Sequence, residues 1–290
     1  MLHRFILHNH EIREATAPCL APGQVGLLSG WGVFSTLRVA EGVLFAFERH
    51  WARIARDAAA FHVPIPEDPE RVRQKLLELV EANQAYNSTL RIAIVRNGGG
   101  MWAAPSFGGS DLIALTADSK DWGHGVKLAT QTQARHAACQ FAGTKILSWA
   151  MNLTWLENAQ RRGFDEVILL NERGEVAECT SANIFVASGT EVWTPPLDSG
   201  CLPGITREVL LGEVHVPGIR ISEKALRLEQ LLSADEVFIT STTRDLLPVT
   251  RIEDHPVGRG DQTRVALASA FSAFVREYIA EHKELSAAGR

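Results

Sequence analysis

Thr144-Lys145-Ile146-Leu147-Ser148 places one lysine directly before an apolar stretch that continues as Trp149-Ala150-Met151. The other lysines of the chain stand among charges, in a polar linker or at the ends of expected elements, where a solvated surface charge is the ordinary role. Desolvation lowers the pKa of a lysine and makes its neutral amine available to attack a carbonyl carbon. Lys145 is therefore a candidate catalytic amine, with a surface charge as the ordinary alternative.

A second segment, Glu178-Cys179-Thr180-Ser181-Ala182-Asn183, carries a carboxylate on an expected strand, and apolar Ile184-Phe185-Val186 follows it. A buried carboxylate needs a partner. A protonated pyridine nitrogen would be such a partner, and the ion pair would keep the pyridine ring an electron sink. The alternative is a glutamate on an edge strand, exposed to water.

A third segment, Leu202-Pro203-Gly204-Ile205-Thr206-Arg207, leads into the apolar helical stretch Val209-Leu210-Leu211. Glycine lets the backbone approach an anion, and the first N–H groups of a helix together with a threonine hydroxyl can bind phosphate. Thr240-Ser241-Thr242-Thr243, at the end of an expected strand, offers further hydroxyl and backbone donors. An ordinary Pro/Gly helix start and a turn-forming hydroxyl cluster are the alternatives.

Composition excludes several classes of protein. In 290 residues, 46% are hydrophobic and 22% charged, and 29 Lys+Arg against 34 Asp+Glu give a net charge of −5. No basic surface for nucleic acid is implied. The four cysteines form no CxxC pair, so neither a zinc site nor a disulfide framework is expected. With no signal peptide and no apolar run near the roughly 20 residues of a membrane helix, a cytoplasmic protein is expected.

The first part of the chain reads as a small α+β domain over residues 1–117. Two strands are expected within 32–47, a helix over 48–61, a second helix over 67–82, and strands over 89–96 and 111–116. Arg53 lies near the edge of the apolar face of the first helix, where a surface arginine is the ordinary interpretation. The glycine run after Asn97 lacks the lysine of a phosphate-binding GxxxxGK[ST] motif, so it is interpreted as a flexible loop near a pocket.

Polar, glycine-containing residues 118–125 read as an interdomain linker, and residues 126–290 as the larger domain. This domain is expected to contain strands over 126–131, 166–170, 183–187, 191–194 and 235–240, with helices over 147–162 and 262–282. No GxSxG, HExxH or GxGxxG motif offers a competing mechanism. His8 and His10 lack the carboxylates that would complete a metal site, so they are interpreted as surface residues.

The ordered segments resemble fold-type IV pyridoxal-phosphate enzymes, which include branched-chain and D-amino acid aminotransferases and 4-amino-4-deoxychorismate lyase. The resemblance extends from Gly30 to about Gly260. It is carried by Lys145, Gly163-Phe164-Asp165-Glu166, Gly174-Glu175-Val176-Ala177-Glu178, Asn183-Ile184-Phe185, Thr194-Pro195 and the segment 202–207. It implies a two-domain α/β fold, similar to that of the D-amino acid aminotransferases, with pyridoxal 5′-phosphate at the domain interface of a homodimer.

The same resemblance implies roles for individual residues. Lys145 would hold the internal aldimine and relay the proton, and Glu178 would pair with the pyridine nitrogen. Arg53, in His50-Trp51-Ala52-Arg53-Ile54, matches the family's phosphate-binding arginine. The remaining phosphate ligands would be Ile205, Thr206 and Thr242.

Signals for the substrate point in two directions. Branched-chain enzymes usually have a tyrosine shortly after the lysine, and Ser148-Trp149-Ala150 has none; Phe34-Ser35-Thr36-Leu37-Arg38-Val39 and Glu178-Cys179 resemble the lyase. Arg91 resembles the pocket arginine of the branched-chain enzymes, where it would hold a carboxylate bidentately. The expected substrate-binding residues are Phe34, Thr36, Arg91, Trp102 and Thr243.

The first hypothesis is a class IV aminotransferase that moves an amino group between a branched-chain-like amino acid and a 2-oxo acid. The alternative is the lyase, which releases pyruvate and p-aminobenzoate with the same lysine; Thr36 or Ser35 would then assist proton transfer. A non-catalytic protein that keeps the fold is a third possibility. The presence of Lys145, Glu178, Arg53 and Thr206 argues against it.

Overall fold

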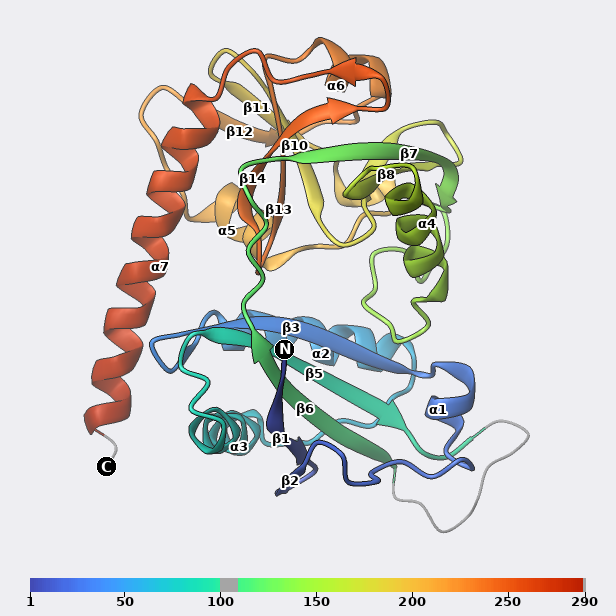
Figure 1. Cartoon of the computed structure of the whole chain (residues 1–290), viewed down its shortest axis with the longest axis vertical. Coiled ribbons are helices and arrows are strands. Elements are labelled where there is room, and N and C mark those ends of the chain that lie inside the picture. Colours follow the sequence, from blue (N-terminus) through green and yellow to red (C-terminus); the bar gives the residue numbers. More distant parts are fainter. Residues whose placement is uncertain (100–108, 289–290) are drawn as a thin grey trace. The chain divides into compact units, whose positions relative to one another are not determined.

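The computed structural model describes residues 1–99 and 109–288, with side chains described as far as residue 283. The chain divides into two compact units (Figure 1). Unit 1 comprises Met1–Lys120, Lys145–Trp149 and Glu277–Arg290; unit 2 comprises Asp121–Thr144 and Ala150–Arg276. By this division, residues 145–149 and 277–290, which the sequence analysis assigned to the larger C-terminal domain, cluster with unit 1.

The described part of unit 1 contains one antiparallel sheet. Its strands are β1 (Leu2–His8), β2 (Glu11–Glu14), β3 (Gly32–Ala40), β4 (Val43–Leu44), β5 (Ser88–Arg96) and β6 (Ser110–Asp118). Their order across the sheet is β2-β1-β6-β5-β3-β4. The strands expected within 32–47 and at 89–96 and 111–116 are confirmed, whereas β1 and β2 were not predicted.

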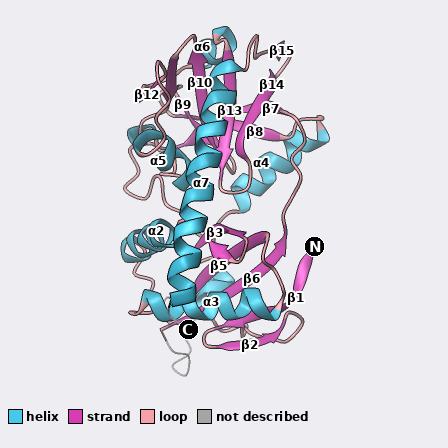
Figure 2. Ribbon diagram, turned by 90° about the vertical axis from the view of Figure 1, so that its left-hand side faces the viewer, coloured by secondary structure: helices cyan, strands magenta, loops and turns pink. Residues whose placement is uncertain are grey.

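Two helices pack on this sheet: α2 (Phe47–Ala60) on β3, and α3 (Pro69–Ala82) on β1 and β6 (Figure 2). Asp68 begins α3 by accepting hydrogen bonds from the Glu70 and Arg71 N–H groups, and Pro69 stands at the first helical position. Apolar residues of α2, α3 and the inward face of β3 form one core cluster, which includes Leu37, Trp51, Ile54, Leu76 and Leu79. The helix α1 (Val25–Ser29), which was not predicted, precedes β3.

The segment Lys145–Trp149 joins unit 1 by extending the edge of β3. Ile146 forms an antiparallel bridge with Val33. The Phe34 N–H donates to the Lys145 carbonyl at 3.0 Å, and the Leu147 N–H donates to the Gly32 carbonyl at 2.9 Å. The expected helix over 147–162 therefore begins later, as α4 (Ala150–Arg161), because the backbone of the preceding residues is engaged by β3.

Unit 2 is built on a larger mixed sheet. Its strands are β7 (Val126–Arg135), β8 (Glu166–Asn171), β9 (Val176–Cys179), β10 (Asn183–Ser188), β11 (Glu191–Thr194), β12 (Arg220–Glu223), β13 (Glu236–Ser241), β14 (Asp245–Ile252) and β15 (His255–Pro256). Their order is β12-β11-β10-β13-β14-β7-β8-β9, with β15 paired to β14. The parallel pairings are β11 with β12, β14 with β7, and β7 with β8.

The helical elements of this part of the chain are α4, η1 (Leu197–Ser199), α5 (Ile205–Gly212), α6 (Leu228–Ser233) and α7 (Gln262–Ala288). Residues of α7 up to Arg276 belong to unit 2, and those from Glu277 belong to unit 1. The core of unit 2 includes Val176 from β9, Ile184 from β10, and Val237 and Ile239 from β13. Among the described residues, no helix is long and apolar enough to span a membrane.

Candidate active site

Lys145 is fixed in unit 1 through its peptide groups. Its carbonyl accepts from the Phe34 N–H at 3.0 Å, and its own N–H donates to Asp57 Oδ2 at 2.9 Å. Asp57 lies on α2, so the lysine backbone is held both by the strand edge and by a helix on one face of the sheet. The side-chain amine, Nζ, lies 4.7 Å from the centre of the Phe34 ring.

One face of β3 and β5 carries three of the expected substrate-binding residues. Phe34 and Thr36 alternate onto the same face, and Thr36 lies directly opposite Arg91 in the antiparallel register. The Arg91 guanidinium lies 4.0 Å from the centre of the Phe34 ring, and the Trp149 ring meets the Phe34 ring edge-on at 5.9 Å. Lys145 Nζ also lies over the Phe34 ring, so Lys145, Arg91 and Trp149 all lie next to this one aromatic side chain.

Arg53 is buried, with 8% of its surface exposed, so its interpretation as a surface arginine is wrong. Its Nη2 donates to Ser35 Oγ at 2.9 Å, and Ser35 Oγ lies 2.8 Å from His50 Nδ1. All three residues are on the α2 side of β3, the face opposite Phe34. Burial and the positive charges of Arg53 and Lys145 hold the pKa of His50 well below its usual range, so His50 is neutral and adds no charge.

Asp57 is a site residue that the sequence analysis missed. Its side chain is 1% exposed, and its Oδ1 accepts from Arg56 Nε at 2.9 Å and from Arg56 Nη2 at 2.5 Å. It lies four residues after Arg53 and so on the same face of α2. That spacing, together with an acidic residue on the apolar face marked by Trp51, Ile54 and Ala58, was the available signal.

In unit 2, Glu178 is held at both oxygens of its carboxylate. Arg135 Nε donates to Oε1 at 2.9 Å, and the Leu202 N–H donates to Oε2 at 3.0 Å. Although β9 stands at the end of the sheet order, the Glu178 side chain is only 10% exposed. The alternative of a glutamate in water is therefore wrong, and the carboxylate is a fixed, partly desolvated anion.

The peptide of Leu202 connects this acid to the expected phosphate segment. While its N–H binds Glu178, its carbonyl accepts from Asn183 Nδ2 at 2.8 Å. A Cβ on Gly204 would lie 2.0 Å from Asn183 Oδ1, so no side chain fits at this position. Gly204 directly precedes α5, and no side chain in the described structure caps the N–H groups of Ile205, Thr206 and Arg207.

Thr242 and Thr243 lie in the tight turn that joins β13 to β14. Within this turn Ser241 pairs with Asp245, and the Arg244 N–H donates to the Ser241 carbonyl at 3.1 Å. Arg244 Nη2 also binds Ser181 Oγ at 2.9 Å and Glu166 Oε2 at 3.2 Å. This buried ion pair attaches the turn to the segment that follows Glu178.

The strand that enters this turn offers one more donor. The Thr240 hydroxyl is buried and has no hydrogen-bond partner among the described residues. Thr240 lies opposite Asn183 in the register of β10 and β13, and α5 packs against β13. The threonine cluster and the start of α5 therefore belong to the same neighbourhood of unit 2.

These features of unit 2 fit a phosphate-bearing pyridine. The uncapped N–H groups of the first helical turn and a buried hydroxyl are donors for phosphate oxygens, and the glycine before the helix lets the backbone approach an anion. Glu178 is an anion suited to a protonated ring nitrogen. In unit 1, the buried cation of Arg53 and the amine of Lys145 suit a phosphate and an aldehyde. Each set therefore has the chemistry that pyridoxal phosphate requires.

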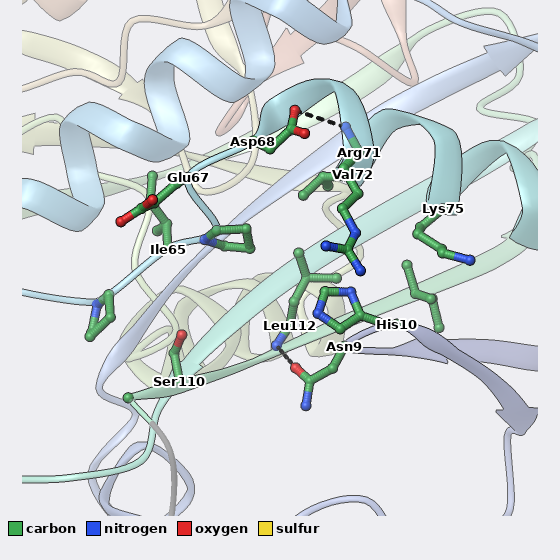
Figure 3. Close-up of a pocket in the computed structure, with 14 residues that line it drawn as sticks. Asn9, His10, Ile65, Glu67, Asp68, Arg71, Val72, Lys75, Ser110 and Leu112 are labelled. Atoms are coloured by element: carbon green, nitrogen blue, oxygen red, sulfur yellow. Dashed lines mark hydrogen bonds between the residues drawn. The ribbon is translucent and has the colours of Figure 1, made fainter.

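Trp102 lies outside the described residues. The described residues contain no group of three or more potential metal ligands. A separate cavity of about 630 Å³ lies in unit 1 between the β1–β2 turn, the segment before α3, α3 itself and the start of β6 (Figure 3). Arg71, Lys75 and His10 line it, together with Ile65 and Val72, and none of the predicted site residues does.

Comparisons with known proteins identify the family of this chain. The model of the amino-transferase class IV family matches residues 32–252. The chain is 31% identical to D-alanine aminotransferase from Bacillus licheniformis over 88% of this chain and 90% of that protein. It is 30% identical to a putative branched-chain-amino-acid aminotransferase from Methanocaldococcus jannaschii, over 79% of this chain and 81% of that one.

Among solved structures, the branched-chain amino acid aminotransferase of Escherichia coli superposes with a TM-score of 0.85 at 22% identity. The superposition covers 93% of this chain and 94% of that one. This similarity confirms the two-domain α/β architecture of fold-type IV enzymes that the sequence predicts.

Proposed function

The chain belongs to the class IV aminotransferase family, whose cofactor is pyridoxal phosphate, and from that premise we propose that it exchanges an amino group between a branched-chain-like amino acid and a 2-oxo acid. The observation that carries the substrate class is the environment of Arg91. Its guanidinium is half-buried beside the Phe34 ring, and no carboxylate of the described residues pairs with it. A cation in that position calls for an anionic ligand.

The carboxylate shared by amino acids and 2-oxo acids is such an anion, and a planar guanidinium binds it bidentately. Burial lowers the pKa of Arg91, as expected for a cation that has lost water without gaining a counter-ion. Phe34 places aromatic surface next to this cation and next to Lys145 Nζ, and the Trp149 ring packs edge-on against Phe34. An aliphatic substrate side chain would find apolar contacts there, which favours a branched-chain-like substrate over a polar one.

The proposed cofactor residues have different roles. When bound, pyridoxal phosphate supplies the electron sink that makes the substrate Cα–H acidic. Lys145 would provide the amine that holds the cofactor at its aldehyde carbon and would carry the proton of the substrate Cα. Glu178, fixed by Arg135 and the Leu202 N–H, would pair with the protonated pyridine nitrogen and accept its hydrogen bond.

The phosphate has separate ligands in this proposal. Arg53 provides a buried charge, and Ser35 keeps its guanidinium in place. The N–H groups of Ile205 and Thr206, the Thr206 hydroxyl and Thr242 complete the set, and Thr243 borders the substrate. The resemblance of the chain to the family also leads us to propose a homodimer, which light scattering of the purified protein would measure.

Absorption spectra of the purified protein with a panel of L- and D-amino acids test this function. L-Valine, L-leucine or L-isoleucine should convert the aldehyde form of the cofactor to the amine form, and a 2-oxo acid should reverse the change. Conversion by D-alanine alone would keep the aminotransferase reaction and overturn the branched-chain assignment. No conversion by any amino acid would overturn the aminotransferase itself.

The lyase is the second candidate, because Thr36 lies on the same face as Phe34 and directly opposite Arg91. Ser35, the other residue considered for proton transfer, faces α2 and binds Arg53, which leaves Thr36 as the candidate for that role. Formation of p-aminobenzoate from aminodeoxychorismate, without any conversion by amino acids, would establish this alternative.

A further inference from the structure

The backbone N–H of Lys145 is used in an unusual way. Lys145 and Phe34 occupy the position of a hydrogen-bonded pair in the antiparallel bridge, where each residue would donate its N–H to the other's carbonyl. Phe34 does donate to Lys145. The Lys145 N–H instead donates to the Asp57 carboxylate at 2.9 Å, so a side chain of α2 has taken the place of the strand.

The contact between Asp57 and the Lys145 N–H requires the Asp57 carboxylate to be buried. The side chain is 1% exposed, whereas its partner Arg56 is 48% exposed. Burying an ionised carboxylate is unfavourable unless its oxygens are satisfied by donors. Arg56 satisfies Oδ1 and the Lys145 N–H satisfies Oδ2, so the lysine peptide is one of the groups that make the buried charge tolerable.

We propose that Asp57 is a positioning residue for Lys145: its carboxylate anchors the lysine peptide so that the side-chain amine starts from a fixed backbone position. The inference rests on the proposed role of Lys145 as the amine that joins the cofactor. Asp57 does not touch the reacting atoms in this proposal. It acts through the hydrogen bond to the Lys145 N–H.

The position of Asp57 on α2 gives this anchor a second property. Arg53, the proposed phosphate ligand, lies one helical turn before Asp57 on the same buried face. A single rigid helix therefore carries both the charge proposed for the phosphate and the anchor of the lysine. The distance between those two anchoring points is fixed by helix geometry and does not depend on loop conformation.

The test compares two ligands, of which only one can form a bond to Lys145. Pyridoxal phosphate has an aldehyde that bonds to a lysine, whereas pyridoxamine phosphate has the same ring and phosphate but an amine in that place. The ratio of their affinities for the apoprotein reports the contribution of the lysine bond alone. A variant that merely disturbs the fold weakens the two ligands equally and leaves the ratio unchanged.

Asp57→Ala should lower this affinity ratio about tenfold, because it removes a charge-assisted hydrogen bond to the lysine peptide. Asp57→Asn keeps an oxygen acceptor without the charge and should lower the ratio about threefold, since a neutral acceptor binds roughly half as strongly. The visible absorbance of the lysine-bound cofactor should form more slowly in both variants. Glu78→Gln, which removes an exposed carboxylate from α3, is the matched control and should leave the ratio at the wild-type value.

An unchanged ratio in folded Asp57→Ala and Asp57→Asn would overturn the proposal; if Asp57→Ala does not fold, an unchanged ratio in Asp57→Asn alone has the same consequence. Failure of the proposed function gives a different result. In that case Lys145→Ala would keep the visible absorbance of the lysine-bound cofactor, or the wild-type protein would bind both ligands equally. The two failures are therefore distinguishable in one set of titrations.

Discussion

Lys145 in unit 1 and Glu178 in unit 2 are both ionisable residues expected to contact the cofactor. The structure holds the first by its backbone and the second by its side chain. Lys145 is held at its peptide, by Asp57 and by Phe34, whereas Glu178 is held at its carboxylate, by Arg135 and by the Leu202 N–H. A residue that transfers a proton between two atoms needs a fixed backbone position and a side-chain group that can move. A residue that only supplies a counter-charge needs a fixed charged group, because movement of that group would weaken its electrostatic effect.

Removing the amine tests the first half of this comparison and has the largest expected effect. Lys145→Ala should lower amino-group transfer by about 10³-fold or more, because the covalent and proton-transfer roles are lost together. Product formation with a saturating amino donor measures the change. Lys75→Ala, which removes a partly buried lysine of α3 paired with Glu78 and away from the predicted site residues, should keep wild-type turnover. Substantial activity in Lys145→Ala would contradict the assignment.

Removing the charge of Glu178 tests the second half. Glu178→Gln should lower turnover about 10²-fold, since an electrostatic partner of the developing charge is lost. Arg135→Gln breaks the same ion pair but leaves the acid in place, so its effect on turnover should be below about tenfold. Equal losses in the two variants would show that Glu178 serves only as the partner of Arg135.

A smaller effect is expected at Gly204, where backbone N–H groups of unit 2 are proposed to bind the phosphate. Gly204→Ala brings a Cβ into Asn183 Oδ1, so the Asn183 side chain, the segment that leads into α5, or both must shift. The affinity for pyridoxal phosphate should fall about tenfold, because the N–H groups of the first turn move away from the phosphate. Affinity for pyridoxal, which has no phosphate, should change much less. A parallel loss for both compounds would separate Gly204 from phosphate binding.

The smallest expected effect concerns the neutral His50 behind Arg53. Its pKa is lowered in the folded protein, so below its ordinary pKa the unfolded chain binds a proton that the folded chain does not bind. Stability is therefore lost as the pH falls through about 6.5, by about 0.8 kcal/mol between about pH 7.5 and about pH 6. Urea unfolding of the wild type and of His50→Gln measures this term, which should be absent from the variant. Equal pH dependence in both would contradict a neutral His50.

The sequence alone predicted much of unit 2 around Glu178 and Gly204, because the signals there are local. A carboxylate on a short strand and a Pro-Gly helix start each occupy a few consecutive residues. The strand β14 was missed, since Pro248 interrupts its pattern and proline is rare inside sheets. The substrate-binding assignment of Trp102, which lies outside the described residues, stays a prediction.

In unit 1 the expected elements 48–61 and 89–96 are confirmed, but the long-range contacts had no signal in the sequence. Nothing local shows that Lys145–Trp149 returns to the edge of β3, because that contact is a pairing between residues more than a hundred positions apart. The hydrogen bond from the Lys145 N–H to Asp57 depends on the same return, and Arg53 is buried with Ser35 of β3 as its partner. An arginine and an aspartate on an amphipathic helix are usually solvated, and only the tertiary structure decides otherwise.

The alternation of β3 has a consequence for how such an enzyme diversifies. Ser35 points toward α2 and Arg53, the proposed phosphate ligand, while Phe34 and Thr36 point away from α2 toward Arg91, and Phe34 also lies next to Lys145 Nζ. Substitutions on the second face leave the first untouched, since neighbouring positions of a strand have no side-chain contact across the sheet. The substrate face can therefore change at Thr36 while the contact between Ser35 and Arg53 is kept, whereas a change at Phe34 also alters the surroundings of the Lys145 amine.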